Sequence, residues 1–104
     1  MTNKDLQKAF DKLNERFFDN RLPSVTVKFG NIKDDGLFTH DEIIISKDLN
    51  KHADFAMITL IHEMVHADII HDGYIGHEHD GGHHTRFYAQ IDKLYKAGIY
   101  EGLL

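Results

Sequence analysis

Two histidines and a glutamate at a fixed spacing are the residues of this chain best suited to chemistry. Residues 62–66 read H-E-M-V-H, an H-E-x-x-H pattern, within an apolar run from Ala53 to Ile70. Side chains four residues apart on an α-helix lie on one face, about a turn apart, so both imidazoles can reach one metal ion. The pattern therefore predicts a zinc ion held by His62 and His66.

Glu63 follows the first histidine and is predicted to lie close to a metal-bound water without binding the metal itself. Zinc with three protein ligands keeps a fourth position for water and lowers the pKa of that water towards neutrality. A neighbouring carboxylate can take the proton as the water attacks a carbonyl group. These roles predict a hydrolase in which Glu63 is the general base and then the proton donor.

An accidental match is the competing interpretation, because the chain has nine histidines in 104 residues. In that case His62 and His66 would be hydrogen-bonded core residues, and Glu63 would be partly exposed. The surrounding segment argues against this. It is apolar on most of its circumference, which predicts a central buried helix. Ionisable groups on such a helix are costly unless they are paired or metal-bound, and a metal ion supplies the partner.

A third metal ligand is expected from beyond this helix. His71 and Asp72 are poor candidates, because on an unbroken helix Asp72 would lie roughly 15 Å along the axis from His62. Asp72-Gly73 instead predicts the end of the helix, with the glycine as its left-handed cap. The remaining candidates follow that point in the sequence: His77, Glu78, His79, Asp80, His83 and His84.

Two separated motifs resemble those of the SprT-like zinc metallopeptidase family, which includes the Spartan proteases. They are L-I-H-E-M-V-H-A at residues 60–67 and G-H-H-T-R-F at residues 82–87. In that family the histidine of a later G-H-G-x-x-F motif is the third zinc ligand, so the resemblance implies His83. His84 stands where the family usually has glycine. Further family motifs occur in the right order, namely Phe10, Asn14, Leu22-Pro23, Gly36 and residues 43–46.

The resemblance implies a zinc metalloendopeptidase with one Zn²⁺ per chain, bound by His62, His66 and His83, with Glu63 as its catalytic residue. The expected substrate is protein or peptide, and Spartan-type relatives act on protein attached to DNA. The alternative is a non-catalytic zinc-binding scaffold or adaptor domain with the same fold. Glu63 argues against the alternative, because a purely structural site needs no carboxylate there.

Composition limits the partners and the compartment. The chain has no cysteine, which excludes disulfides, cysteine-ligated zinc and thiol catalysis. Residues 1–5 contain no apolar signal segment and no apolar run could span a bilayer, so a cytoplasmic protein without membrane contact is expected. A net charge of −5 with scattered Lys and Arg predicts no strong direct binding to nucleic acid. We expect a minimal form without the C-terminal zinc ribbon, so recruitment to DNA would need a partner.

The sequence predicts an α+β fold, a minimal zincin-like domain spanning residues 1–104. Leu6, Phe10, Leu13 and Phe17 recur at helical spacing and predict an amphipathic helix over residues 3–20 with Asn3 as its N-cap. Residues 25–29, 37–39 and 42–46 predict a small antiparallel or mixed sheet of about three strands. By resemblance, its edge strand could align the substrate backbone. A final helix is predicted from residue 82 or 83 to residues 97–98, capped by Gly98.

The other polar residues receive more modest assignments. His40 and His52 are predicted to be surface or helix-end residues rather than ligands. His77, His79 and Asp80 belong to a glycine-rich loop, where solvated side chains explain them better than a second, weaker metal site. An oxyanion stabiliser is also expected, with Tyr74, Arg86 and Tyr100 as unranked candidates. The tail from Ile99 to Leu104 carries no interpretable signal.

Overall fold

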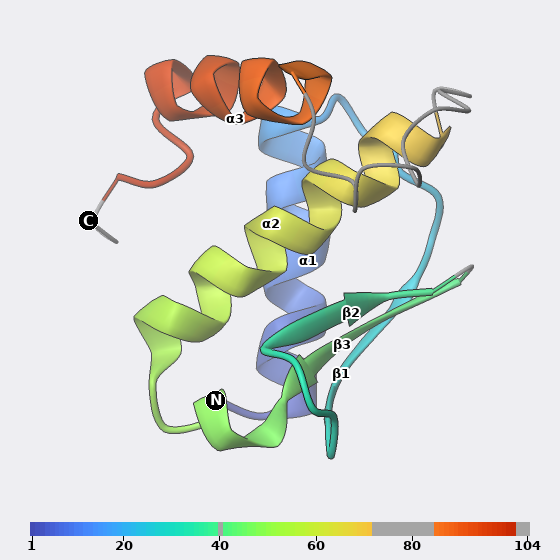
Figure 1. The fold of residues 1–104 in the computed structure, drawn as a ribbon, viewed down its shortest axis with the longest axis vertical. Helices are drawn as coiled ribbons and strands as arrows, with labels where there is room; N and C mark the ends of the chain where they lie inside the picture. The colour runs from blue at the N-terminus through green and yellow to red at the C-terminus, as the bar shows by residue number, and fades with distance from the viewer. Residues whose placement is uncertain (40, 72–84, 102–104) are drawn as a thin grey trace.

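A computed structural model describes residues 1–39, 41–71 and 85–101 of the chain. Within them the chain forms three α-helices and a three-stranded mixed sheet, which confirms the predicted α+β class (Figure 1). The elements in chain order are α1 (Asn3–Phe17), β1 (Thr26–Gly30), β2 (Gly36–Phe38), β3 (Glu42–Ser46), a short 3₁₀ turn η1 (Lys47–Leu49), α2 (Ala53–His71) and α3 (Thr85–Ala97).

The sheet has the strand order β1-β3-β2, so the last strand in the sequence lies in the centre. β3 runs parallel to β1 and antiparallel to β2. Its run of β-branched residues suits that position, because Ile43 and Ile45 are fully buried on the face that packs on the helices. β2 is left as an edge strand and contacts α2.

α2 is the central helix, and it contacts β2 and β3 as well as α3 (Figure 1). Leu60, Ile61, Met64 and Val65 are fully buried, and they belong to a core that also includes Leu6 and Phe10 of α1. Apolar residues surround most of this helix, as predicted, because neighbours cover it on more than one side. Of the helices in the described part of the chain, none is long and apolar enough to cross a bilayer.

The ends of α1 differ from the prediction. The N-cap is Thr2, which forms a capping box with Asp5, and not Asn3. The side chain of Asn3 is used elsewhere, because its Oδ1 accepts the backbone N–H of Phe29 in β1 at 2.8 Å. The helix also ends at Phe17 instead of Asn20, and Asp19 and Asn20 adopt left-handed backbone angles, with φ of 53° and 58°.

Asn14 holds the connection that leads from α1 to the sheet. Its buried amide donates to the Leu22 carbonyl at 3.1 Å and accepts the Leu22 N–H at 3.2 Å. At the other end of the chain, Gly98 adopts a positive φ of 95° and ends α3 as predicted. The tail has a structural role that the sequence did not indicate, because Ile99 is buried in the core.

Candidate metal and catalytic site

His62 and His66 face each other on α2. They lie one turn apart, their ring centroids are 4.8 Å apart, and their Nε2 atoms form a hydrogen bond of 3.1 Å. Both side chains are partly exposed. The i, i+4 spacing therefore brings the two imidazoles together through their Nε2 atoms, as the H-E-x-x-H pattern predicts.

This pair has the right donor chemistry and spacing for zinc. Two nitrogen ligands of a tetrahedral Zn²⁺, with bonds of about 2.0–2.1 Å, lie about 3.3 Å apart. The observed separation of 3.1 Å between the Nε2 atoms is close to that value. Two metal–nitrogen bonds would replace the single N–H···N hydrogen bond, and neither ring would need to move far.

Phe87 of α3 packs against both imidazoles. Its ring centroid lies 4.9 Å from that of His62 and 4.6 Å from that of His66. The side chain is buried, with 2% of its surface exposed. The sequence indicated residue 87 as the last position of the G-H-H-T-R-F motif, and the structure shows that its ring packs on the histidine pair.

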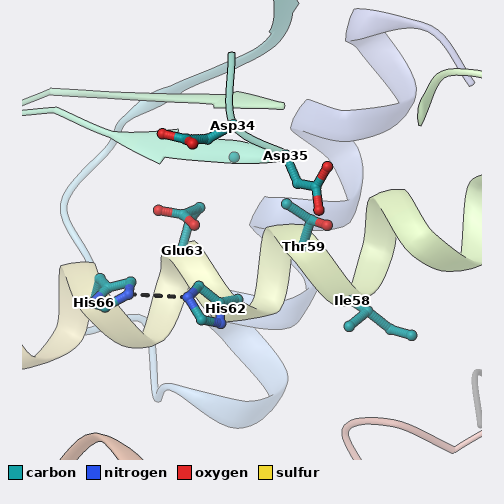
Figure 2. A pocket seen from close by; sticks show the side chains of 8 residues that line it. Asp34, Asp35, Ile58, Thr59, His62, Glu63 and His66 are labelled. Atoms are coloured by element: carbon teal, nitrogen blue, oxygen red, sulfur yellow. Dashed lines mark hydrogen bonds between the residues drawn. The ribbon is translucent and has the colours of Figure 1, made fainter. Parts of the chain in front are cut away.

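Glu63 is buried on the side of α2 that faces β2, and 8% of its surface is exposed. Figure 2 shows its side chain directed from α2 towards Asp34. Burial, followed by the negative charge of Asp34, raises the pKa of Glu63 from 4.5 to about 7, although a hydrogen bond from the Phe38 backbone acts in the opposite direction. Without metal, this carboxyl group therefore titrates near neutral pH.

Gly36 allows β2 to approach α2 closely. A Cβ atom at this position would lie 2.6 Å from Cγ2 of Thr59 and 3.1 Å from both Cγ and Oε2 of Glu63. Non-bonded Cβ contacts as short as 2.6 Å essentially do not occur in folded proteins, so any side chain here would displace its neighbours. The absence of a side chain at Gly36 therefore keeps Glu63 in its place beneath the strand.

The three motif residues line one open cleft of about 480 Å³. Asp34 and Asp35, from the turn before β2, form its acidic wall, and α2 forms the other (Figure 2). The described lining residues are Asp34, Asp35, Gly36, Ile58, Thr59, His62, Glu63 and His66. The sequence indicated Asp34 and Asp35 only as turn formers. A cleft with paired imidazoles and a buried carboxyl group is suited to proton transfer and metal binding.

The predicted third ligand, His83, lies outside the described residues. The same holds for the loop residues His77, His79 and Asp80, for the substitute ligand His84, for His40 and for Tyr74. Within the described ranges, no group of three His, Cys, Asp or Glu side chains is arranged to hold a metal ion. The prediction of His83 as a ligand therefore stays a prediction.

The remaining candidates from the sequence lie away from the cleft. Arg86 lines a separate cavity beside Arg21 and Asp68. Tyr100 contacts Tyr95, with ring centroids 6.3 Å apart, and burial raises the pKa of its hydroxyl. Neither is among the described residues that line the cleft, so neither is placed there as an oxyanion stabiliser. His52 is exposed beside Phe55 at the start of α2, as predicted.

Substitution of Gly36 tests the close approach of β2 to α2. We expect Gly36→Ala to lower the free energy of unfolding by about 1–3 kcal/mol, because the new methyl group overpacks Thr59 and Glu63. Thr59→Ser removes the Cγ2 methyl group that would lie 2.6 Å from the new Cβ. The double variant should therefore recover part of the lost free energy of unfolding. Urea denaturation measures all of these values.

Gly30→Ala is the matched control for this cycle. Gly30 lies in β1, the other edge strand, and its Cβ would lie 2.7 Å from Cγ2 of Ile44 in the central strand β3. It should lose a similar amount of stability, and Thr59→Ser should restore none of it. Equal recovery in the Gly30→Ala and Gly36→Ala backgrounds would contradict the packing described for Gly36.

The raised pKa of Glu63 predicts a pH-dependent stability in metal-free protein. The folded state holds this proton more tightly than the unfolded chain, so the stabilisation is complete below about pH 4.5 and is lost as the pH rises to about 7. Glu63→Gln abolishes this titration. Above pH 7 the variant should be more stable than the wild type by about 2 kcal/mol, with little difference at about pH 4.

Urea denaturation in the presence of a chelator, repeated across this pH range, measures the difference. Glu15→Gln, at an exposed position of α1, controls for the loss of one negative charge from the acidic chain. A stability gain in Glu63→Gln that does not change with pH would refute the assignment of the titration to Glu63.

Comparison with known proteins is consistent with this geometry. Searches of curated proteins and of solved structures returned no match. The model of the SprT-like family matches residues 6–101, which include most of α1, all of α2 and α3, and the whole sheet. On that match, which covers most of its length, the chain belongs to the SprT-like family.

Proposed function

We propose that this protein is a zinc metallopeptidase that hydrolyses peptide bonds in polypeptide substrates. The observation that carries the proposal is one cleft in which the Nε2 atoms of His62 and His66 lie 3.1 Å apart, beside the buried carboxyl group of Glu63. Membership of the SprT-like family supports it, because the H-E-x-x-H motif on α2 matches the zinc-binding helix of that family.

The proposed metal site consists of His62, His66 and His83, with one Zn²⁺ per chain. When bound, the ion would act as a Lewis acid that polarises the substrate carbonyl and lowers the pKa of a water molecule. Phe87 would hold both imidazoles in place, since it packs on each of them from α3. The described part of the chain thus contributes two ligands and their support.

Glu63 would accept a proton from the attacking water and return it to the leaving amine. A general base is most effective when its pKa lies near the working pH, and the pKa of about 7 in the metal-free chain is in that range. A cation beside the carboxyl group would favour its charged form and lower this pKa. β2 packs closely against this side chain at Gly36, which has no side chain of its own.

The substrate would enter as an extended segment between α2 and β2. β2 is an edge strand, so its outer edge can pair with a polypeptide backbone. The backbone groups of Gly36 and Phe38 face away from β3, so they lie on the outer edge of β2 where such pairing would occur. Asp34 and Asp35 make this wall acidic and disfavour nucleic-acid phosphate, so any action on DNA-bound protein would depend on a partner.

A non-catalytic zinc-binding scaffold is the second candidate function. It accounts for the histidine pair and for the support from Phe87. It does not account for Glu63, because a buried carboxyl group with a raised pKa destabilises the metal-free fold and a structural zinc site has no use for it. The two candidates differ in whether the zinc-loaded protein cleaves a polypeptide.

Metal content tests the proposed ligand set. Untagged wild-type protein should contain about one zinc ion per chain by elemental analysis, because three histidines suffice for a zinc site with an open position. His83→Ala should lose most of this metal, and His52→Ala, which removes an exposed histidine at the start of α2, should retain it. A wild type without tightly held metal would refute the proposed function. Zinc retained in His83→Ala would assign the third ligand to another residue of the segment 72–84.

Glu63→Gln separates catalysis from metal binding. We expect the variant to keep its zinc, since the carboxyl group is not a ligand, and to cleave an unfolded polypeptide at least about 100-fold more slowly, because the general base is lost. Cleavage is followed by gel electrophoresis with protein of matched zinc content. Equal cleavage by the wild type and the variant would exclude Glu63 as the base. A zinc-loaded wild type that cleaves no substrate would favour the scaffold.

A further inference from the structure

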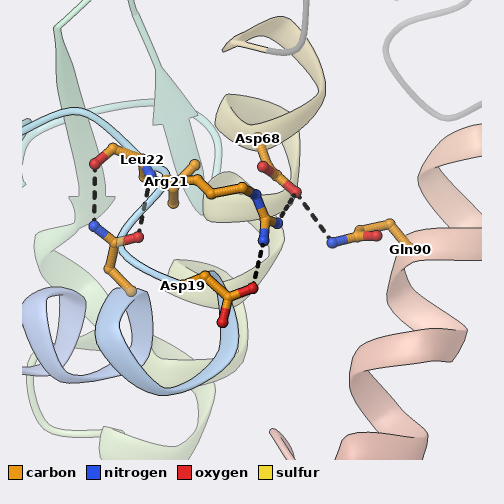
Figure 3. Close-up of polar contacts among 6 residues, drawn as sticks. Asp19, Arg21, Leu22, Asp68 and Gln90 are labelled. Atoms are coloured by element: carbon orange, nitrogen blue, oxygen red, sulfur yellow. Dashed lines mark hydrogen bonds and ion pairs between the residues drawn. The ribbon is translucent and has the colours of Figure 1, made fainter.

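Besides Glu63, α2 buries a second acid, Asp68, which the proposed mechanism does not use. Its Oδ2 accepts two hydrogen bonds of 3.0 Å, one from Nε2 of Gln90 on α3 and one from Nη2 of Arg21 in the α1–β1 connection (Figure 3). Arg21 also forms a longer, exposed contact of 3.4 Å with Asp19. One carboxylate oxygen therefore joins three parts of the chain.

We propose that Asp68 and Gln90 are positioning residues of the metal site: their hydrogen bond sets the placement of α3 on α2, and so holds Phe87 against His62 and His66. This inference rests on the proposed function for its purpose. It names a role for two residues that lie outside the catalytic cleft and have no contact with a reacting group.

The first argument is the energetic cost of Asp68 in its location. Only 8% of its surface is exposed, and its neighbours Ala67 and Ile69 on α2 are buried apolar residues. Replacing a buried ion pair by apolar side chains of similar size is often neutral or stabilising, so stability alone does not explain an acid here. Hydrogen bonds to a charged group are shorter, stronger and more directional than apolar contacts. Such hydrogen bonds can therefore fix the position of one helix relative to another.

The second argument is the position of Gln90 relative to Phe87. Residues three apart on a helix lie on the same face, so both side chains face α2. Asp68 follows His66 by two residues on α2 and therefore points in a different direction, yet α3 contacts both residues. α3 is thus attached to α2 at two neighbouring points, one aromatic and one polar. The hydrogen bond adds a directional restraint to the apolar contacts that α3 makes through Phe87 and Leu94.

Arg21 and Gln90 have separable effects on Asp68. Arg21 compensates the buried negative charge, but it links α2 to the α1–β1 connection, away from the histidine pair. Gln90 carries no charge and links α2 to the helix that carries Phe87. Loss of the Gln90 hydrogen bond leaves the ion pair intact. A change at the histidines in a Gln90 variant would therefore report on the placement of α3 and not on an unpaired buried charge.

The experiment compares Gln90→Met with Lys96→Met. Methionine keeps the length and packing of Gln90 but cannot donate the hydrogen bond, and Lys96→Met removes only an exposed pair with Asp92 on the same helix. The first readout is the NMR chemical shifts of the His62 and His66 ring protons in metal-free protein, which sense the ring current of Phe87. The second is zinc affinity, measured by competition with a chelator.

Gln90→Met should shift the ring-proton resonances and weaken zinc binding by about 10–100-fold, the range typical of residues that orient metal ligands. Lys96→Met should do neither. Asp68→Asn can keep an oxygen acceptor for Gln90, so its zinc affinity should lie closer to that of the wild type than the affinity of Asp68→Ala. Unchanged resonances and affinity in a folded Gln90→Met variant would overturn the inference.

The two proposals fail in distinguishable ways. A wild type that binds no zinc would refute the proposed function, and the metal-free NMR comparison would still decide whether Gln90 positions Phe87. If Gln90→Met does not fold, Asp68→Asn and Asp68→Ala, which both lose the ion pair with Arg21, are compared with each other. Equal zinc affinity and equal ring-proton shifts in Asp68→Asn and Asp68→Ala would then overturn the positioning role.

Discussion

The constraint on which this structure depends is the burial of ionisable side chains on an apolar helix. α2 carries the partly exposed His62 and His66 and buries Glu63 and Asp68, and every other buried residue of this helix is apolar. Each buried charge or polar ring needs a partner, because the desolvation of an unpaired group costs several kcal/mol, on the order of the net stability of a small domain. The partners come from α3, β2 and the α1–β1 connection, so the positions of these elements depend on the polar side chains of α2.

The same constraint explains the form of the cleft. Glu63 lies beneath β2, which approaches α2 closely because Gly36 has no side chain between the strand and the helix. The approach also removes water from the carboxyl group, which raises its pKa to about 7. A single close contact between a strand and a helix thus sets both the position and the protonation of the proposed base. The metal-free fold loses stability as a consequence, which is the usual relation between stability and an active site.

Those features of the fold and site that depend on local spacing were predictable from the sequence. The i, i+4 histidines, the bounds of β3 and the glycine at the end of α3 follow from helix and strand geometry within a few residues. The N-cap of α1 was not, because Thr2 and Asn3 are both good caps. The choice depends on Phe29, which is 26 residues away from Asn3 and engages its side chain.

Other features depend on contacts between distant residues. The strand order β1-β3-β2 requires knowledge of which strand lies in the centre, and strand propensity does not carry that information. Asp68 is separated from Arg21 by 47 residues and from Gln90 by 22. An acid within an apolar helix was the only local signal for this cluster, and its meaning became clear when its partners were known.

The arrangement of α2 bears on the choice between a catalyst and a scaffold. A structural zinc site needs ligands and support, which the histidine pair and Phe87 would supply. A scaffold would be more stable with an apolar or amide side chain at position 63, where the carboxyl group is buried and its pKa is raised. Burial of Glu63 lowers the stability of the metal-free fold at neutral pH, and the proposed role in proton transfer would account for a carboxyl group in the cleft. The environment of this residue, more than the presence of metal ligands, therefore favours a hydrolytic enzyme.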